Sequence, residues 1–255
     1  MTASPHSQAE PQADDAGDQT SRILHLLMHG SIAPVGQVVW GSNYTYLVNV
    51  SEGGSTLQAI YKPARGERPL WDFPYGSLVE REAAAYLVSE ALGWGFVPPT
   101  ILRRDGPAGA GSLQLYIEAD PEEHYFTLDA DQKDRLRPLV LFDILVNNAD
   151  RKGGHILLDS SGTLWSIDHG VCFHVEPKLR TVVWDFVGEP IPGQLLDDIG
   201  GLLKQLSPGR TLEKQLSVLL SEQELEAMRL RARALLAEPV FPGPGPGRPY
   251  PWPLV

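Results

Sequence analysis

The sequence has a single cysteine, Cys172, among its 255 residues. One thiol cannot form an internal disulfide, so a disulfide-stapled fold is excluded and a reducing compartment, the cytoplasm, is expected. No apolar run approaches the ~18 residues needed to span a bilayer. The first twenty residues are polar and lack the basic and apolar regions of a signal peptide. We therefore expect a cytoplasmic protein without stable membrane association.

Positive charge is also scarce, because 21 Lys and Arg face 32 Asp and Glu and leave a net charge of −11. That balance argues against nucleic acid or anionic lipid as the main partner, although a few local cations and a metal would suffice for a nucleotide. Neither a Gly-x-Gly-x-x-Gly pattern nor a Walker pattern is present. Ser42 and Asn43, which follow Gly41 in a tight connection, are the candidates to cover phosphates, and a plain hairpin is the alternative.

The order of apolar patterns predicts an α+β fold with two lobes and a cleft between them. We expect a disordered tail over residues 1–20, a β-rich lobe over 21–120, a helical lobe over 121–238 and a Pro/Gly-rich extended tail over 239–255. The expected strands are a hairpin over Val38–Val50, then Leu57–Tyr61, Val97–Leu102 and Ser112–Ile117. The expected helices are Leu78–Leu92, Leu136–Val146, Leu195–Leu206, Thr211–Leu219 and Glu222–Ala237.

Three polar residues near the centre of the chain fit phosphoryl transfer. Asp150 lies in a loop entered from a helix, where a carboxylate can accept a proton from a hydroxyl nucleophile. Asp168 follows a short apolar strand, and its hard oxygen atoms suit a divalent metal between phosphates. His155 is compatible with a softer metal, with phosphate hydrogen bonding, or with a weakened site. For either Asp taken alone, an ordinary turn hydrogen bond is the simpler interpretation.

Lys62 ends a strand immediately before Pro63, where an ammonium can meet a carboxylate from a neighbouring helix. Kinases hold their phosphate-binding lysine in this way, paired with a helix glutamate. Glu82 in the next expected helix is the better candidate for that partner, ahead of Glu80. A solvated lysine at a strand end is the alternative for Lys62.

In this order, the motifs resemble the phosphatidylinositol 3-/4-kinase-like superfamily of atypical kinases. The likeness rests on Glu82–Val88, Val97–Thr100, Asn148–Arg151 and Ile167–Gly170, and it extends over residues 25–190. Within the superfamily the chain is similar to type II phosphatidylinositol 4-kinases and to an uncharacterised bacterial kinase-like group, and more distantly to HipA-type kinases.

The resemblance implies a protein-kinase-like fold that uses ATP with Mg²⁺ or Mn²⁺. Lys62 would then hold the ATP phosphates and Glu82 would orient Lys62. Asp150, with Arg151 beside it in the catalytic loop, would be the catalytic aspartate, and Asp168 would bind the metal. His155 stands where the family carries the metal-binding Asn.

The sequence leaves three functions open. The main hypothesis is transfer of the γ-phosphoryl group to a hydroxyl of a protein or a soluble small molecule. A lipid acceptor is disfavoured, because the chain is acidic, lacks a cysteine cluster for acylation and has no basic amphipathic face. The first alternative is a pseudokinase that binds nucleotide as a regulatory module. The second is a metal-dependent phosphohydrolase that uses Asp150, His155 and Asp168 together.

Overall fold

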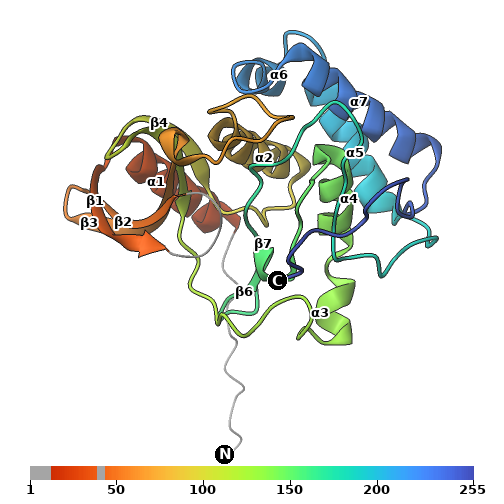
Figure 1. The fold of residues 1–255 in the computed structure, drawn as a ribbon, viewed down its shortest axis with the longest axis horizontal. Helices are drawn as coiled ribbons and strands as arrows, with labels where there is room; N and C mark the ends of the chain where they lie inside the picture. Colours follow the sequence, from red (N-terminus) through yellow and green to blue (C-terminus); the bar gives the residue numbers. More distant parts are fainter. Residues whose placement is uncertain (1–12, 39–43) are drawn as a thin grey trace, which may run out of the picture.

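The structure, a computed structural model, describes residues 13–38 and 44–255. Figure 1 shows a β-sheet half and a helical half side by side, with helix α2 between them. Two separate hydrophobic cores accompany this division. The smaller one includes Leu27, Val48 and Leu113, and the larger one fills the helical half around residues such as Phe142 and Met228. The predicted α+β, two-lobed architecture is thereby confirmed.

The sheet has five antiparallel strands in the order β1-β2-β3-β5-β4. Alternating burial, as in Val48 and Val50 on β2 or Ala59 and Tyr61 on β3, gives the sheet its apolar face. The strands are β1 (Ser31–Val38), β2 (Thr45–Glu52), β3 (Ser55–Pro63), β4 (Thr100–Gly106) and β5 (Gly109–Leu115). Strand β4 begins later than the predicted Val97, because Pro98 and Pro99 lack the N–H group that a ladder needs.

Helix α1 (Ala13–His29) lies against the sheet and corrects one prediction. Residues 13–20, expected to be disordered, form its first turns, while residues 1–12 lie outside the described residues. The helix is held because Leu27 is fully buried in the smaller core. Arg103 of β4 also donates to the carbonyl oxygens of Leu27 (2.8 Å) and Gly30 (3.1 Å) at the end of the helix. Carbonyl groups at a helix C-terminus have no partner within the helix, so a cation there stabilises it.

Helix α2 (Leu78–Leu92) has the predicted bounds and ends at Gly93, whose φ of 70° suits glycine. It contacts β4 and β5 on one side and α5 and α6 on the other. Its residues Ala84, Tyr86 and Val88 belong to the core of the helical half. The helix that carries Glu82 is therefore packed against both halves of the protein.

The helical half begins with a capped turn and continues to the end of α7. Its elements are α3 (Ala130–Asp134), α4 (Arg137–Val146), α5 (Gly193–Gln205), α6 (Thr211–Leu216) and α7 (Glu222–Ala237), with a hairpin of β6 (Ile156–Leu158) and β7 (Leu164–Ser166) after α4. The bounds of α7 are the predicted ones, and Ser221 with Glu224 forms its capping box. Among the described residues, no helix has the length and apolar character required to cross a bilayer.

Residues 239–255 are not a free tail. Pro-Gly repeats keep the segment out of helices and sheets, as predicted, but both of its ends contact the folded body. Phe241 is 1% exposed, and the backbone carbonyl of Leu254 accepts a hydrogen bond from Gly153 at 2.7 Å. The sequence predicts an extended tail without showing where it attaches, and the structure adds these tertiary contacts.

Candidate active site

Three charged side chains from three different elements meet between the two halves. Lys62 lies on β3, where it pairs with Ser112 of β5, and Glu82 lies on α2. The Lys62 ammonium donates to a carboxylate oxygen of Glu82 and to Oδ1 of Asp168, the latter at 2.9 Å. Asp168 follows β7 with a φ of 62°, a left-handed conformation that turns its carboxylate toward the lysine. The residues Lys62 and Asp168 are 106 positions apart in the sequence and are joined only by the fold.

Electrostatics fixes the charge of this group. Burial by itself would lower the pKa of Lys62, but the charges of Asp168 and Glu82 outweigh it, so the pKa of Lys62 is raised and the ammonium stays protonated. Desolvation would raise the pKa of Asp168, yet Lys62 and then His155 hold that pKa well below its usual range. The Asp168 side chain is 46% exposed, which leaves its carboxylate accessible to a ligand.

Glu82 contacts both halves of the site. One of its carboxylate oxygens accepts from Lys62, and the other accepts from the backbone N–H of His169 at 3.0 Å. The neighbouring Arg81 fixes the same helix to the helical half, because it donates to the carbonyl oxygen of Cys172 (3.1 Å) and to Glu224 of α7 (2.5 Å). Helix α2 is therefore held in the position at which Glu82 reaches Lys62.

Asp150 occupies the loop that follows α4. Asn147 ends that helix with a φ of 54°, and the Asn148 side chain accepts from the Asp150 N–H at 3.0 Å. The Asp150 carboxylate lies 3.3 Å from the Lys152 ammonium, and its side chain is 32% exposed. The pKa of Asp150 is raised to about 6. Desolvation is the main cause and the charge of Asp168 contributes, while Lys152 and Arg180 act in the opposite direction. A carboxylate with this pKa is a suitable proton acceptor near neutral pH.

Arg151, predicted as part of the catalytic set, is fully buried. Its guanidinium forms two hydrogen bonds with Asp143 of α4, at 2.9 and 3.0 Å, and donates to the carbonyl oxygen of Ile167 at 2.8 Å. It also donates to Nε2 of His169 at 2.8 Å. Arg151 therefore joins the Asp150 loop to the Asp168 turn as a positioning residue. Adjacency to Asp150 in the sequence does not show which way the side chain points.

His155 faces Asp168, with 3.2 Å between its Nε2 and Oδ2 of the carboxylate. Its Nδ1 accepts from the Lys152 N–H over 3.4 Å, so the ring proton lies on Nε2 and points at Asp168. The pKa of His155 is lowered to about 4. Desolvation is the main cause, the charge of Asp168 opposes it, and the charges of Arg151, Lys152 and Lys62 add to the lowering. The ring is neutral at pH 7 and hydrogen-bonds the carboxylate.

Asn147 also organises the segment after Asp168, a role that sequence reasoning missed. Its side-chain amide donates to the carbonyl oxygens of His174 (2.8 Å) and Glu176 (2.7 Å) and accepts from the Lys178 N–H (2.8 Å). The Asn-Asn pair before Asp150 was the available signal, since Asn tolerates the left-handed backbone that the turn requires.

Comparison with known proteins identifies the family to which this chain belongs. The family model "Phosphatidylinositol 3- and 4-kinase" matches residues 79–224, more than half of the chain. The chain belongs to this family. A Mycobacterium tuberculosis protein, Rv2133c, is 42% identical over 89% of this chain and 94% of its own length. Phosphatidylinositol 4-kinase gamma 4 of Oryza sativa is 26% identical over 64% of this chain, and gamma 2 of Arabidopsis thaliana is 26% identical over 66%. The matches span 35% and 38% of those two plant kinases.

Solved kinase structures share the fold at low sequence identity. The Golgi casein kinase with Mn/ADP bound superposes with a TM-score of 0.55 at 13% identity, over 87% of this chain and 75% of that one. The Helicobacter pylori proinflammatory kinase CtkA gives 0.50 at 11% identity, over 84% of this chain and 94% of that one. The recognised superfamily and the two-lobed kinase fold are confirmed.

The kinase family match contains Glu82, Asp150, His155 and Asp168 but begins after Lys62. The structure adds Lys62 to the group through its two carboxylate contacts. Ser42 and Asn43, predicted to cover phosphates, lie outside the described residues.

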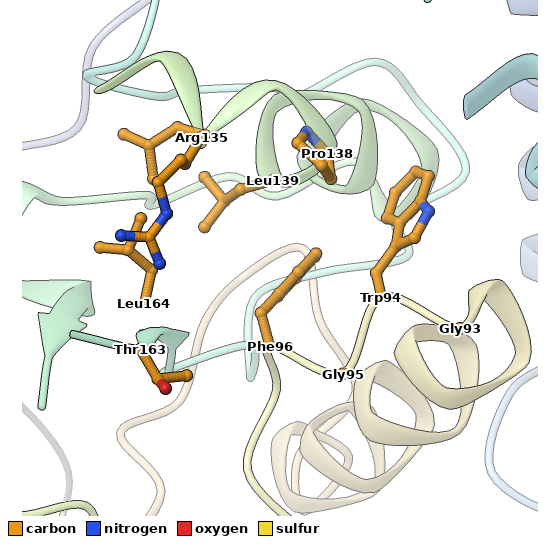
Figure 2. Close-up of a pocket in the computed structure, with 10 residues that line it drawn as sticks. Gly93, Trp94, Gly95, Phe96, Arg135, Pro138, Leu139, Thr163 and Leu164 are labelled. Carbon is orange, nitrogen blue, oxygen red and sulfur yellow. The ribbon is translucent and has the colours of Figure 1, made fainter. Parts of the chain in front are cut away.

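A separate cavity of about 390 Å³ lies at the loop after α2, away from these side chains. Figure 2 shows Arg135 and Leu164 on the left and Trp94 on the right, with Leu139 and Phe96 between them. None of the predicted site residues lines it. The wall of this cavity is joined to strand β7, because the Ser166 N–H donates to the Phe96 carbonyl oxygen at 2.8 Å.

Proposed function

We propose that this protein is a phosphotransferase that binds ATP between its lobes and transfers the γ-phosphoryl group to a hydroxyl of a protein or a soluble small molecule. The observation that carries the proposal is the convergence of Lys62, Glu82 and Asp168 from β3, α2 and the turn after β7. We propose that the lobes divide near residue 120 and that the protein is cytoplasmic. The acidic composition disfavours nucleic acid or a membrane surface as partner.

Each residue has a distinct role in this reaction. The Lys62 ammonium binds phosphate oxygens, and Glu82 keeps that ammonium directed into the cleft. Asp150 accepts the proton of the attacking hydroxyl as that oxygen bonds to the γ-phosphorus. The bond from the γ-phosphorus to the β–γ bridging oxygen breaks and ADP leaves. A pKa of about 6 keeps Asp150 ionised at pH 7. Lys152, 3.3 Å from Asp150, adds a second cation beside the position of the transferred group.

The donor set suits a divalent cation. Asp168 presents an accessible, ionised carboxylate, and His155 lies beside it with a neutral ring. Asp168 would hold the ion, with His155 either as a second ligand or as a hydrogen-bond donor to the carboxylate. When bound, the cation neutralises phosphate charge. Mn²⁺ accepts imidazole more readily than Mg²⁺ does, so the His155 position favours Mn²⁺ if the ring is a ligand.

The orientation of His155 favours one alternative, a pseudokinase that binds nucleotide without turnover. The hydrogen bonds of the ring favour the tautomer in which Nε2 carries the proton, and in that tautomer the nitrogen that faces Asp168 has no lone pair for a metal. A site with only one strong metal ligand from the protein would bind nucleotide and transfer phosphate slowly.

The phosphohydrolase alternative has less support. A two-Asp, one-His metal centre needs its ligands gathered around one point. In the part of the chain that the structure describes, no group of three His, Cys, Asp or Glu side chains lies close enough to hold a metal. A kinase site does not need such a cluster, because nucleotide phosphates complete the coordination.

Thermal unfolding with ATP and Mg²⁺ or Mn²⁺ tests nucleotide binding. A ligand at 100 times its Kd stabilises the folded state by about 2.7 kcal/mol, or roughly 5–10 °C in Tm for a chain of this size. Asp168→Ala should abolish the shift, whereas Asp197→Ala, which removes an exposed carboxylate of α5, should retain it. If no metal–nucleotide pair raises Tm, both nucleotide-binding functions are wrong.

ADP formation then separates kinase from pseudokinase. The kinase proposal requires turnover that Asp150→Ala reduces to background while the nucleotide-induced Tm shift persists. Wild-type protein that binds ATP but forms no more ADP or phosphoprotein than Asp150→Ala, across both metals, would establish the pseudokinase instead.

A further inference from the structure

The segment after α7 returns across the helical half and ends at the candidate active site. Its first contact is Phe241, which is buried 5.5 Å from the ring of Phe186. Backbone hydrogen bonds join Phe241 to Glu189 and Pro239 to Ile191, both at 2.9 Å. This first contact anchors the segment independently of the residues beyond it.

Residues 242–248 form an exposed connection. All seven are solvent-exposed, and their alternating Pro and Gly residues support neither helix nor strand. In Figure 1 the end of the chain lies beside β6 and β7, far from the last turn of α7. The connection therefore spans the distance between the Phe241 anchor and a second contact at the site.

The second contact is made by residues 249–255, here called the C-terminal segment. The Thr181 N–H donates to the carbonyl oxygen of Pro249 at 3.0 Å, and the Gly153 N–H donates to that of Leu254 at 2.7 Å. A Cβ built on Gly154 would lie 3.6 Å from Cγ1 of Val255. Gly153 and Gly154 separate Asp150 from His155, so the C-terminal segment covers the catalytic loop itself.

The two donor residues, Gly153 and Thr181, belong to neighbouring backbone segments near Asp150. Residues Arg180 and Val182, on either side of Thr181, pair with Asn148 (2.9 Å) and Arg151 (3.1 Å) of the catalytic loop. The N–H group of Thr181 thus points away from the catalytic loop, toward the neighbouring C-terminal segment. Backbone donors that point away from their own neighbouring segment can bind a peptide through its carbonyl oxygens.

The C-terminal segment presents two carbonyl oxygens to these donors, with bends at Tyr250, Trp252 and Pro253 between them. Its sequence alternates Pro249, Pro251 and Pro253 with aromatic or aliphatic residues. Pro249 is half-buried and Pro251 is buried, whereas Tyr250 and Trp252 are 47% and 75% exposed. Proline lacks an N–H group but keeps its carbonyl oxygen. A proline-rich segment can therefore accept hydrogen bonds from the two donors although it has few N–H groups of its own.

We propose that the catalytic loop at Gly153 and the backbone at Thr181 form a docking site for a polypeptide segment, and that the C-terminal segment occupies this docking site in the resting protein. The inference rests on the proposed phosphotransfer for its consequence: a polypeptide acceptor must displace the segment to approach Asp150. The Phe241 anchor keeps the displaced segment near the docking site, where it competes with the acceptor at high effective concentration.

A chain shortened after Arg248 tests the docking site without any catalytic assay. It retains Phe241, so we expect cooperative unfolding with little change in Tm. A synthetic peptide with the sequence of residues 249–255 should bind the shortened chain and bind the full chain at least ~10-fold more weakly, as measured by fluorescence anisotropy. A scrambled peptide of the same composition is the control. Equal binding to both chains, or none to a folded shortened chain, would overturn the proposal.

A disulfide lock tests displacement. A Cβ built on Gly154 lies 3.6 Å from Cγ1 of Val255, so replacing both residues by cysteine tests a disulfide between these positions, and the native Cys172 is fully buried. With dephosphorylated casein as the polypeptide probe, the shortened chain should transfer phosphate faster than the full chain. The oxidised double variant should lose transfer and regain it on reduction. Slower transfer by the shortened chain would instead make the segment a support for the catalytic loop.

The two proposals fail in different ways. If no variant forms ADP or phosphoprotein, the phosphotransferase assignment fails, and the peptide-binding result still decides the docking site. If transfer occurs but neither truncation nor the lock alters its rate, the displacement model is wrong and the phosphotransferase assignment stands.

Discussion

Asp150→Asn should stabilise the protein while removing its activity. The pKa of Asp150 is raised from 3.8 to about 6, so the folded protein prefers the protonated carboxyl and ionisation at neutral pH costs stability. Asparagine has the same shape without the charge. The substitution therefore removes a destabilising charge that the reaction requires in its ionised form, and the gain is expected in protein without nucleotide or metal.

The magnitude follows from the shift. One pKa unit corresponds to about 1.4 kcal/mol, so a change from 3.8 to about 6 gives an upper bound of about 3 kcal/mol. Because the side chain is 32% exposed, solvent screening reduces this to about 1–2 kcal/mol. For a domain of this size that gain raises Tm by about 2–8 °C.

The pH dependence gives the prediction its sign. A carboxyl group whose pKa is raised on folding costs stability only at pH values where it would be ionised in the unfolded chain. The cost is absent below about pH 4, grows up to about pH 6 and is constant above. Thermal unfolding in EDTA at pH 5.0 and 7.5 should show a gain at pH 7.5 and about half that gain at pH 5.0.

Asp159→Asn is the control of opposite sign. Although desolvation opposes it, hydrogen bonds from Ser161 and then Trp165 lower the pKa of Asp159 to about 2, so its ionised form stabilises the fold at both pH values. Its replacement should lower Tm equally at pH 5.0 and 7.5. The reasoning about Asp150 is refuted if Asp150→Asn leaves Tm unchanged or lowered at pH 7.5, or if its effect does not differ between the two pH values.

Three further outcomes follow from the site. Arg151→Ala should destabilise the protein by about 3–5 kcal/mol, because it leaves the buried Asp143 carboxylate unpaired, and urea unfolding measures this; a loss below about 1 kcal/mol would contradict the positioning role. His155→Asn should increase Mg²⁺-supported ADP formation relative to Mn²⁺ if the ring limits metal binding, and an unchanged metal preference would argue against that role. The rate of transfer should rise with pH through about 6 and then level as Asp150 ionises, whereas a rate independent of pH from 5 to 8 would exclude Asp150 as the base.

Much of the fold could be predicted, because local patterns specify local structure. The apolar spacing and the glycine stop located α2, and the predicted bounds of α7 match the structure. Helix α1 (Ala13–His29) was not predicted, since its polar first turns depend on the burial of Leu27 further along the helix. The attachment of residues 239–255 was missed because a Pro-Gly segment has no periodicity from which contacts can be inferred.

The candidate site was predictable as a set of residues and not as a set of contacts. Lys62, Glu82, Asp150 and Asp168 occur in kinase order with typical residue types, and that order makes them candidates. Arg151 was assigned to catalysis by adjacency, and only the structure shows its side chain directed inward to Asp143. The direction of a loop side chain depends on neighbours that are distant in sequence.

The amino-acid sequence by itself determined the family, the α+β lobes and the charged residues of the site, because these depend on residue type, spacing and periodicity along one chain. The tertiary structure alone decided which residues act together. Hydrogen bonds between Lys62 and Asp168, between Glu82 and the His169 backbone, and between Gly153 and Leu254 join positions 106, 87 and 101 residues apart. Contacts over such separations form only when both lobes and the C-terminal segment are folded, since no local propensity brings those atoms together.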